Sequence, residues 1–313
     1  MRVAAIAIAL FTLACSTARP TESVRMVPDE AQAVLSILDK RQAGETITDA
    51  DWFHLFATEG YVRLKAREHS MQRQFEDETF RAFVMSDELL ARRDELSKTV
   101  ASWLRADISH AAQLALAYLP KGSKLRAKVY PVIKPATNSF VFELDNDPAI
   151  FLYVEPQPRE VFEATVAHEL HHVGYANNCP DNDSPQWFSA FGEGIATLAA
   201  AGGPSGIPQR KPEVMAEWTS QMAKYEENFR KVDQFLADVA SGNLSEEEQR
   251  KRGFEFFGMV GPWYTIGWKM AVVIEEKYGR EALIRAACDP REMLRLYNQA
   301  AGDLPKWSET VTK

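Results

Sequence analysis

The sequence predicts an α+β fold that is predominantly helical, with a small sheet packed on the helix that follows it. Apolar residues recur with a helical period through most of residues 28–120, and again from residue 159 to the end. Between these regions, residues 128–133, 139–144 and 149–154 are short runs rich in β-branched and aromatic side chains, a pattern typical of strands. This order favours one small sheet set among many helices.

The first helices are bounded by residues with known positional preferences. After a short polar linker at residues 16–27, Pro28 suits the start of a helix and Gly44 its end, so a helix is expected between them. Thr48 can cap a second helix, which is expected to end near Gly60.

Residues 61–118 form a mixed-charge stretch with helical period, and breaks are expected near Ser86 and Ala106. The alternating acids and bases of this stretch are typical of solvent-facing helix surfaces. Further along, the Pro and Gly residues at 202–212 and 258–262 are expected to separate the C-terminal helices.

The composition argues for a folded protein and against nucleic acid as a partner. The 313 residues are 46% hydrophobic and 26% charged, which is the ordinary balance of a globular protein. Asp and Glu total 44 against 36 Lys and Arg, giving a net charge of -8, whereas phosphate binding needs a concentrated basic face.

The first residues are typical of an export signal. Arg2 supplies a positive charge, and residues 3–14 form an apolar stretch too short to span a bilayer. The segment ending at Cys15 resembles a bacterial lipobox, in which this cysteine is lipidated; the alternative is ordinary cleavage after Ala18. We therefore expect an export signal over residues 1–18, a location in the bacterial periplasm or outer envelope, and contact with a membrane only through a lipid anchor.

Two further cysteines, Cys179 and Cys288, are consistent with export. In an oxidising compartment they could form one disulfide. Two separate buried thiols are the alternative, because the sequence does not show whether the residues lie close together.

The segment around residue 170 carries the chemistry. His168-Glu169-x-x-His172 lies in a stretch without helix breakers, so both histidines project from one helix face and can bind one zinc ion. Glu169 can reach a water held by that metal and take its proton as general base. His171 points about 100° away from this face, which suggests a position behind the ligands or on the surface.

A catalytic zinc usually has three protein ligands and one open position. No histidine follows His172, so a downstream third ligand is expected to be a carboxylate. Glu193 is the only acid in the small, apolar segment 188–200, where a lone charge is costly unless it is paired or metal-bound. Asp181 and Asp183 are the competing candidates, but they lie in a polar loop.

This motif, followed by Glu193 in a Gly-Glu-Gly-x-Ala setting, resembles the gluzincins, the thermolysin-like zinc metallopeptidases, and within them a set of poorly characterised bacterial predicted zinc-dependent peptidases. The resemblance covers residues 130–200, with a weaker match over 263–278. It implies a zincin-like fold in which an edge strand before the motif helix aligns an extended peptide, with residues 149–154 as the counterpart here. Many gluzincins carry an Asp four residues after the ligand Glu; Thr197 stands there instead, so support for the zinc-binding histidines must come from elsewhere.

Peptide hydrolysis also needs a hydrogen-bond donor for the developing oxyanion. The downstream histidine of thermolysin has no counterpart here, and several relatives use a tyrosine. Tyr264, expected in the first turn of a helix, is our candidate for the donor, with Tyr175 as the next choice. An aromatic core cluster with Trp263 and Trp268 is the alternative reading of this segment.

The preferred hypothesis is an exported zinc-dependent peptidase that binds one Zn²⁺ through His168, His172 and Glu193, acts on a peptide or protein substrate, and uses Glu169 as general base. A zinc-containing, peptide-binding envelope lipoprotein without proteolytic activity is the first alternative. The same zinc chemistry applied to a small ester, amide or cell-wall peptide is the second.

Along the chain, the export signal at 1–18 is expected to precede a helical N-terminal region at 19–120 and a zincin-like catalytic region at 121–313. The sequence leaves the oligomeric state open.

Overall fold

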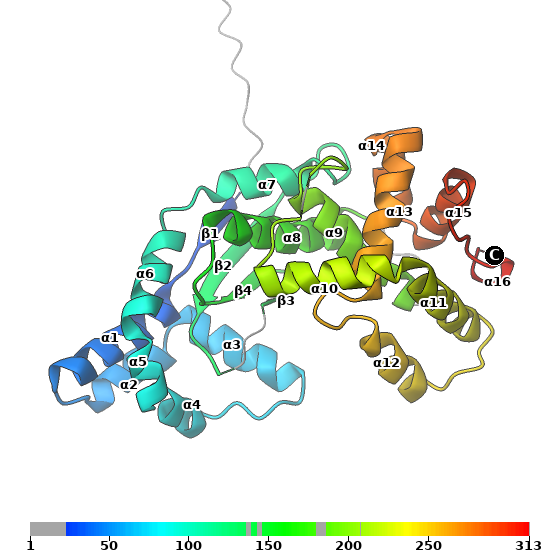
Figure 1. Cartoon of the computed structure of the whole chain (residues 1–313). Helices are drawn as coiled ribbons and strands as arrows, with labels where there is room; N and C mark the ends of the chain where they lie inside the picture. Colours follow the sequence, from blue (N-terminus) through cyan, green and yellow to red (C-terminus); the bar gives the residue numbers. More distant parts are fainter. Residues whose placement is uncertain (1–22, 136–138, 143–145, 180–185, 207, 313) are drawn as a thin grey trace, which may run out of the picture.

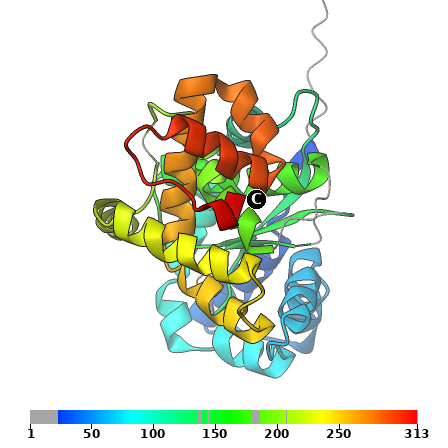
Figure 2. The same cartoon turned by 90° about the vertical axis from the view of Figure 1, so that its right-hand side faces the viewer.

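The computed structural model describes residues 23–135, 139–142, 146–179, 186–206 and 208–312. These residues form many helices and one four-stranded sheet, which confirms the expected α+β class. Figures 1 and 2 both show the green central segment, with the sheet, between the blue-to-cyan N-terminal helices and the orange-to-red C-terminal helices. The expected export signal and Cys15 lie outside the described residues.

The strands are β1 Ser23–Met26, β2 Arg126–Val132, β3 Phe140–Phe142 and β4 Ala149–Tyr153. The helices, with one 3-10 helix η1, are α1 Asp29–Ala43, α2 Asp49–Phe56, α3 Glu59–Ser70, α4 Asp77–Val84, α5 Asp87–Ala91, α6 Arg93–Trp103, α7 Ile108–Leu116, α8 Arg159–Asn178, η1 Gln186–Phe191, α9 Gly192–Ala200, α10 Pro212–Ala223, α11 Tyr225–Ala240, α12 Glu246–Glu255, α13 Pro262–Tyr278, α14 Arg280–Ala287, α15 Pro290–Ala300 and α16 Glu309–Thr312. None of the described helices combines the length and apolar character needed to cross a membrane.

The sheet has the order β1-β2-β4-β3, with β1, β2 and β4 parallel and β3 antiparallel to β4. Because β4 is paired on both sides, the expectation that residues 149–154 form an edge strand is wrong. The outer strand on this side is β3, which follows β2 in the chain but folds back to lie beyond β4. Sequence patterns locate strands but do not give their order.

Alternate residues of the sheet face different helices, as a period of two requires. Val129 and Ile150 are neighbours in the register and pack in the same core as Phe162 of α8. On the opposite face, Tyr130 and Phe151 pack in a smaller cluster with residues that include Leu64 of α3.

Several expected boundaries are confirmed and others are corrected. α1 ends at Gly44, which has a left-handed φ of 71°, and Thr48 caps α2 in a capping box. Gly60, however, lies in the first turn of α3 rather than at the end of α2. Breaks occur at Ser86 and near Ala106 as expected, but the break at residues 71–76 was not predicted.

β1 corrects the expectation of a polar linker over residues 16–27. The four residues Ser23–Met26 pair in parallel with the start of β2. A strand this short carries too little alternation to stand out in the sequence, and its backbone bonds to β2 stabilise it.

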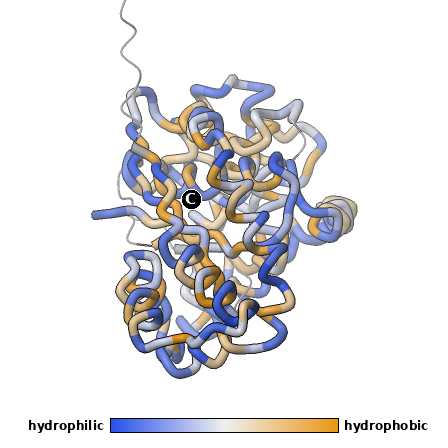
Figure 3. The backbone as a smooth tube through the Cα atoms, turned by 90° about the vertical axis from the view of Figure 1, so that its left-hand side faces the viewer, coloured by the Kyte–Doolittle hydropathy of each residue, from blue (hydrophilic) through white to orange (hydrophobic). Residues whose placement is uncertain are grey.

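Buried side chains form two main cores that meet at the centre of the molecule. The first joins the N-terminal helices to the sheet and α8. The second joins η1 and α9 to the C-terminal helices, with Trp263 and Phe235 among its largest members. Figure 3 shows hydrophobic stretches toward the interior and hydrophilic stretches in many outer turns.

Candidate active site

Helix α8 brings the His-Glu-x-x-His motif to the boundary between the two cores. The helix begins after Pro158, and one side of it, including Phe162, Val166 and Leu170, is fully buried in the first core. His168 and His172 are four residues apart and project from another face, where each is only partly exposed. The sheet-facing side therefore fixes the rotation of the helix, and with it the direction of both imidazoles.

Glu193 lies on helix α9, which belongs to the second core. Helix α9 packs very closely on α13. A Cβ atom at Gly194 would lie 2.0 Å from the backbone nitrogen of Trp268 and 2.5 Å from Cα of Gly267. Only a residue without a side chain permits this approach. The preceding residue, Glu193, is thereby held in the first turn of α9, facing α8.

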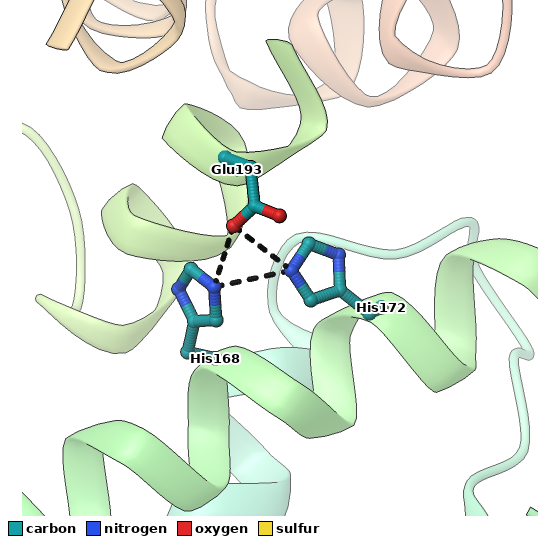
Figure 4. A group of neighbouring side chains, drawn as sticks. All are labelled: His168, His172 and Glu193. Carbon is teal, nitrogen blue, oxygen red and sulfur yellow. Dashed lines mark hydrogen bonds and ion pairs between the residues drawn. The ribbon is translucent and has the colours of Figure 1, made fainter. Parts of the chain in front are cut away.

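The three expected ligands converge on one point (Figure 4). Oε2 of Glu193 lies 3.0 Å from Nε2 of His168 and 3.3 Å from Nε2 of His172, and the two Nε2 atoms are 3.1 Å apart. Two ligand atoms bound at about 2.0–2.1 Å to a tetrahedral zinc are about 3.3–3.4 Å apart. The trio therefore forms a triangle close to one face of a zinc tetrahedron, and the donor set of two imidazoles and one carboxylate fits the ion.

The pKa values of the three residues indicate which of them carries a proton. Burial would raise the pKa of Glu193, but the two histidines hold the pKa of that carboxyl well below its usual range. Burial lowers the pKa of His168 to about 4. Burial acts in the same direction on His172, but Glu193 outweighs it and raises the pKa of His172 to about 9. At neutral pH His172 thus carries a proton that a divalent cation would displace, since metal-binding histidines are neutral.

Glu169 lies directly beside the trio and is not one of its members. Burial raises the pKa of its carboxyl to about 7, with Glu193 adding to the rise and His172 opposing it. A carboxyl whose pKa lies near neutrality can both accept and return a proton during a reaction.

Tyr264 covers the trio from the first turn of α13. Its ring stacks on the imidazole of His168 with 6.1 Å between ring centroids. Burial, followed by the nearby Glu193 and Glu169 carboxylates, raises the pKa of the phenol well above its ordinary value, so the hydroxyl keeps its proton and can donate it. Tyr175, the other candidate, donates its hydroxyl to the carbonyl of Ala287 at 3.0 Å.

The remaining histidines take no part in the trio. His171 is buried, so a surface position is excluded; its Nε2 lies 3.4 Å from the carbonyl oxygen of Tyr118. His54, His69 and His110 are exposed. The competing ligand candidates Asp181 and Asp183 lie outside the described residues.

Two cavities meet at the trio and share the lining residues Ser139, His168, Glu169 and Tyr264. The first cavity, of 610 Å³, extends along the N-terminal half of α8 toward residues 208–214. The second, of 440 Å³, extends past β3 and the C-terminal half of α8. A substrate bound across the trio would therefore find space on both sides of the reacting bond.

Arg210 is a residue of this site that the sequence did not reveal. It lines the first cavity, and its Nη2 donates to Oγ1 of Thr197 at 2.8 Å. Thr197 in turn donates to the backbone oxygen of Glu193. A single arginine in a Pro- and Gly-containing break has no spacing relation to the motif, so no sequence signal pointed to it.

Cys179 and Cys288 form a disulfide, with 5.1 Å between their Cα atoms. The bond connects the residue after α8 to the residue after α14. Of the two possibilities left open by the sequence, the structure has the bonded one.

A protein-family model described as "Putative zinc dependent peptidase (DUF5700)" matches residues 52–305 of the chain. No curated protein and no solved structure matches the chain. The matched segment contains both helices of the trio, α13 with Tyr264, and most of the N-terminal helices.

Proposed function

Because the chain belongs to this zinc-dependent peptidase family, we propose that it hydrolyses a peptide bond with a water activated at His168, His172 and Glu193. The observation that carries the proposal is the convergence of these three side chains, from two helices, beside Glu169 and between two cavities. One zinc ion held there would supply a Lewis acid that lowers the pKa of a coordinated water toward neutrality.

The residues of the chain then divide the proton transfers between them. Glu169 takes a proton from the attacking water and returns it to the leaving amine, which its position beside the trio and its pKa near 7 support. Tyr264 keeps its proton at neutral pH and donates a hydrogen bond to the oxygen of the reacting carbonyl as negative charge develops there.

The outer strand β3 supports an extended peptide or protein substrate. Its residues Phe140 and Val141, with the adjacent Ser139, line the second cavity beside the motif helix. One edge of β3 pairs with β4, so its other edge can pair with an added strand. A peptide bound in this way would pass its backbone across the trio.

The first test compares Glu169→Gln with the wild-type protein. We expect the variant to retain about one zinc per chain by elemental analysis and to lose at least about 100-fold in kcat on a peptide library, because it keeps the ligands and lacks the base. Glu163→Gln is the matched control, since Glu163 is on the same helix but pairs with Arg159 and His110. Full activity in Glu169→Gln would remove Glu169 from the mechanism.

The ligand set has its own test. Glu193→Ala should bind zinc far more weakly than wild type, because it leaves two imidazoles and no carboxylate. If the wild-type protein binds no zinc after reconstitution, the peptidase proposal falls and α8 is a structural helix.

Thr197 favours a second candidate function, a zinc-containing protein that binds peptides and does not cleave them. Thr197 and Arg210 stand near Glu193 where many gluzincins place a carboxylate. Tight peptide binding by zinc-loaded wild-type protein, without cleavage of any library member, would select this alternative.

We further propose that the protein is exported to the bacterial periplasm or outer envelope. The Cys179–Cys288 disulfide supports an oxidising compartment, in agreement with the apolar segment at the N-terminus. Cell fractionation tests the location, and mass spectrometry of the mature N-terminus distinguishes a lipid-modified Cys15 from cleavage after Ala18. A mature chain that retains its first residues in the cytosol would overturn the proposal.

A further inference from the structure

Arg210 places a guanidinium in the first cavity without a carboxylate partner among the described residues. Its one described hydrogen bond goes to the hydroxyl of Thr197, and its Nε is buried without a hydrogen-bond partner among the described residues. The guanidinium lies 5.5 Å from the ring centroid of Trp218 and 5.8 Å from that of Tyr264. Two aromatic rings and one hydroxyl therefore hold the group in position and leave most of its donors unused.

Lys211, the neighbouring basic residue of the same cavity, already has an acidic partner. Its ammonium forms an ion pair with Glu155, which also lines the cavity. Glu193, whose charge acts on Arg210, is itself committed to His168 and His172. Of these two basic residues, Arg210 is therefore the one available to a negatively charged ligand. A partly buried charge of this kind is costly until a ligand pairs with it.

We propose that Arg210 is a specificity-determining residue that binds a carboxylate of the peptide substrate. A guanidinium matches a carboxylate with two parallel hydrogen bonds, and a peptide offers that group either as an Asp or Glu side chain or as its free C-terminus. The ring of Tyr264 contacts both Arg210 and His168, so the bound carboxylate belongs to a residue at or next to the bond that is cleaved. This assignment names the substrate class of the proposed peptidase and rests on that function.

Matched peptides test the assignment by cleavage. One series replaces Gln by Glu at each position around the scissile bond, and a second compares a free C-terminal acid with the corresponding amide. We expect the wild-type protein to cleave the carboxylate member of one series at least about 10-fold faster in kcat/KM. The Glu series identifies an acidic side chain and the free-acid series identifies a C-terminus, so the two sources are distinguished. Equal rates within both series would overturn the assignment.

Variants then test whether Arg210 is the residue that distinguishes a carboxylate peptide from its amide counterpart. Arg210→Met should abolish the preference, while Arg210→Lys keeps a charge without the fork and should retain only part of it. Lys211→Met removes a positive charge from the same cavity and should leave the preference ratio unchanged, whatever its effect on overall rate. A preference that survives Arg210→Met, or that is lost in Lys211→Met, would contradict the assignment. Thermal melts of each variant establish that it is folded.

Measurements of peptide binding test the role of Arg210 independently of whether the protein cleaves peptides. Calorimetry with zinc-loaded Glu169→Gln protein should show at least about 10-fold tighter binding of the preferred carboxylate peptide than of its amide partner. Carboxylate-dependent binding without cleavage by wild type would refute the peptidase and keep the role of Arg210. Cleavage without discrimination would keep the peptidase and refute the role of Arg210.

Discussion

Tyr264 and Tyr175 are two tyrosines near the trio whose surroundings differ. The ring of Tyr264 stacks on His168, and the backbone carbonyl of Ala287 accepts the hydroxyl of Tyr175. The hydroxyl of Tyr175 has a backbone partner outside the trio, whereas the hydroxyl of Tyr264 interacts with Glu193 of the trio, and Tyr264 lines both cavities beside Glu169.

Tyr264→Phe is therefore expected to lower kcat by about 100-fold with little change in KM or zinc content, since it removes a hydrogen bond made mainly in the transition state. Tyr175→Phe serves as the control: it should cost about 1 kcal/mol of stability through the lost bond to Ala287 and leave kcat near the wild-type value. Steady-state kinetics on one peptide measures both. The opposite pattern would transfer the donor role to Tyr175.

Glu30 is a buried acid in the first turn of α1, far from the motif in sequence. Its Oε2 accepts the backbone N–H of Ile133 at 3.0 Å, while its Oε1 is buried and has no hydrogen-bond partner in the part of the chain that the structure describes. Burial raises the pKa of this carboxyl to about 8; Asp29 adds to the rise, and Ile133 and Lys134 oppose it. The folded protein therefore holds a proton that the unfolded chain releases near its ordinary pKa of 4.5.

This difference makes stability depend on pH with a defined sign. The contribution of Glu30 is fully present below pH 4.5 and is lost as the pH rises toward 8, because only the folded state is protonated in that interval. Urea unfolding at several pH values should show the free energy of unfolding of Glu30→Gln changing less than that of wild type, by on the order of a few kcal/mol between pH 5 and 8. Parallel curves for the two proteins would show that Glu30 titrates normally.

At the scale of single residues, the site residues that could be predicted are those marked by motif spacing or by an unusual local composition. The spacing of His168 and His172 indicated a shared helix face, and the isolation of Glu193 among apolar residues indicated a paired or liganded acid. Arg210 had no such mark, because its importance comes from the rings and the cavity that surround it in the folded chain.

Among the elements, the crossing of α9 and α13 controls the position of Glu193. Backbone meets backbone there: a methyl group at Gly194 would come within 2.2 Å of the carbonyl carbon of Gly267. Backbone atoms cannot rotate away as a side chain can, so the two helices would have to separate. Separation would move Glu193 relative to the histidines of α8.

Gly194→Ala is expected to destabilise the protein by about 1–3 kcal/mol and to weaken zinc binding. Gly192→Ala provides a control in the same helix, since a Cβ atom at Gly192 would have none of the described residues within 4 Å, and it should change stability by less than about 0.5 kcal/mol. Urea unfolding and zinc titration report the two effects. If Gly194→Ala behaves like Gly192→Ala in both, the close crossing does not control the trio.

Element boundaries were predictable where one residue type has a strong positional preference. Gly44 and Thr48 mark helix ends through backbone conformation and capping, and both were placed correctly. The order of the strands was not predictable, because the pairing of β2 with β4 and with β1 depends on contacts between segments that are distant in sequence. The short strand β1 was missed for the same reason.

For the whole molecule, the site lies where two cores meet, so its geometry depends on how they are joined. α8 belongs to the first core and α9 to the second. The Cys179–Cys288 disulfide adds a covalent connection between the end of α8 and the C-terminal helices. The sequence could not establish this pairing, because 109 residues separate the two cysteines.

Replacing both cysteines by serine is expected to lower the free energy of unfolding by roughly 2–5 kcal/mol, since the unfolded chain gains the freedom that a long closed loop denies it. A reducing agent should lower the Tm of wild type in the same way and leave the double variant Cys179→Ser/Cys288→Ser unchanged. Zinc binding should persist in the reduced protein well below its Tm, because His168, His172 and Glu193 are positioned by packing of α8 and α9 rather than by the bond. If reduction, verified by mass spectrometry, abolishes zinc binding while the fold remains intact by circular dichroism, the disulfide itself holds the two cores in register.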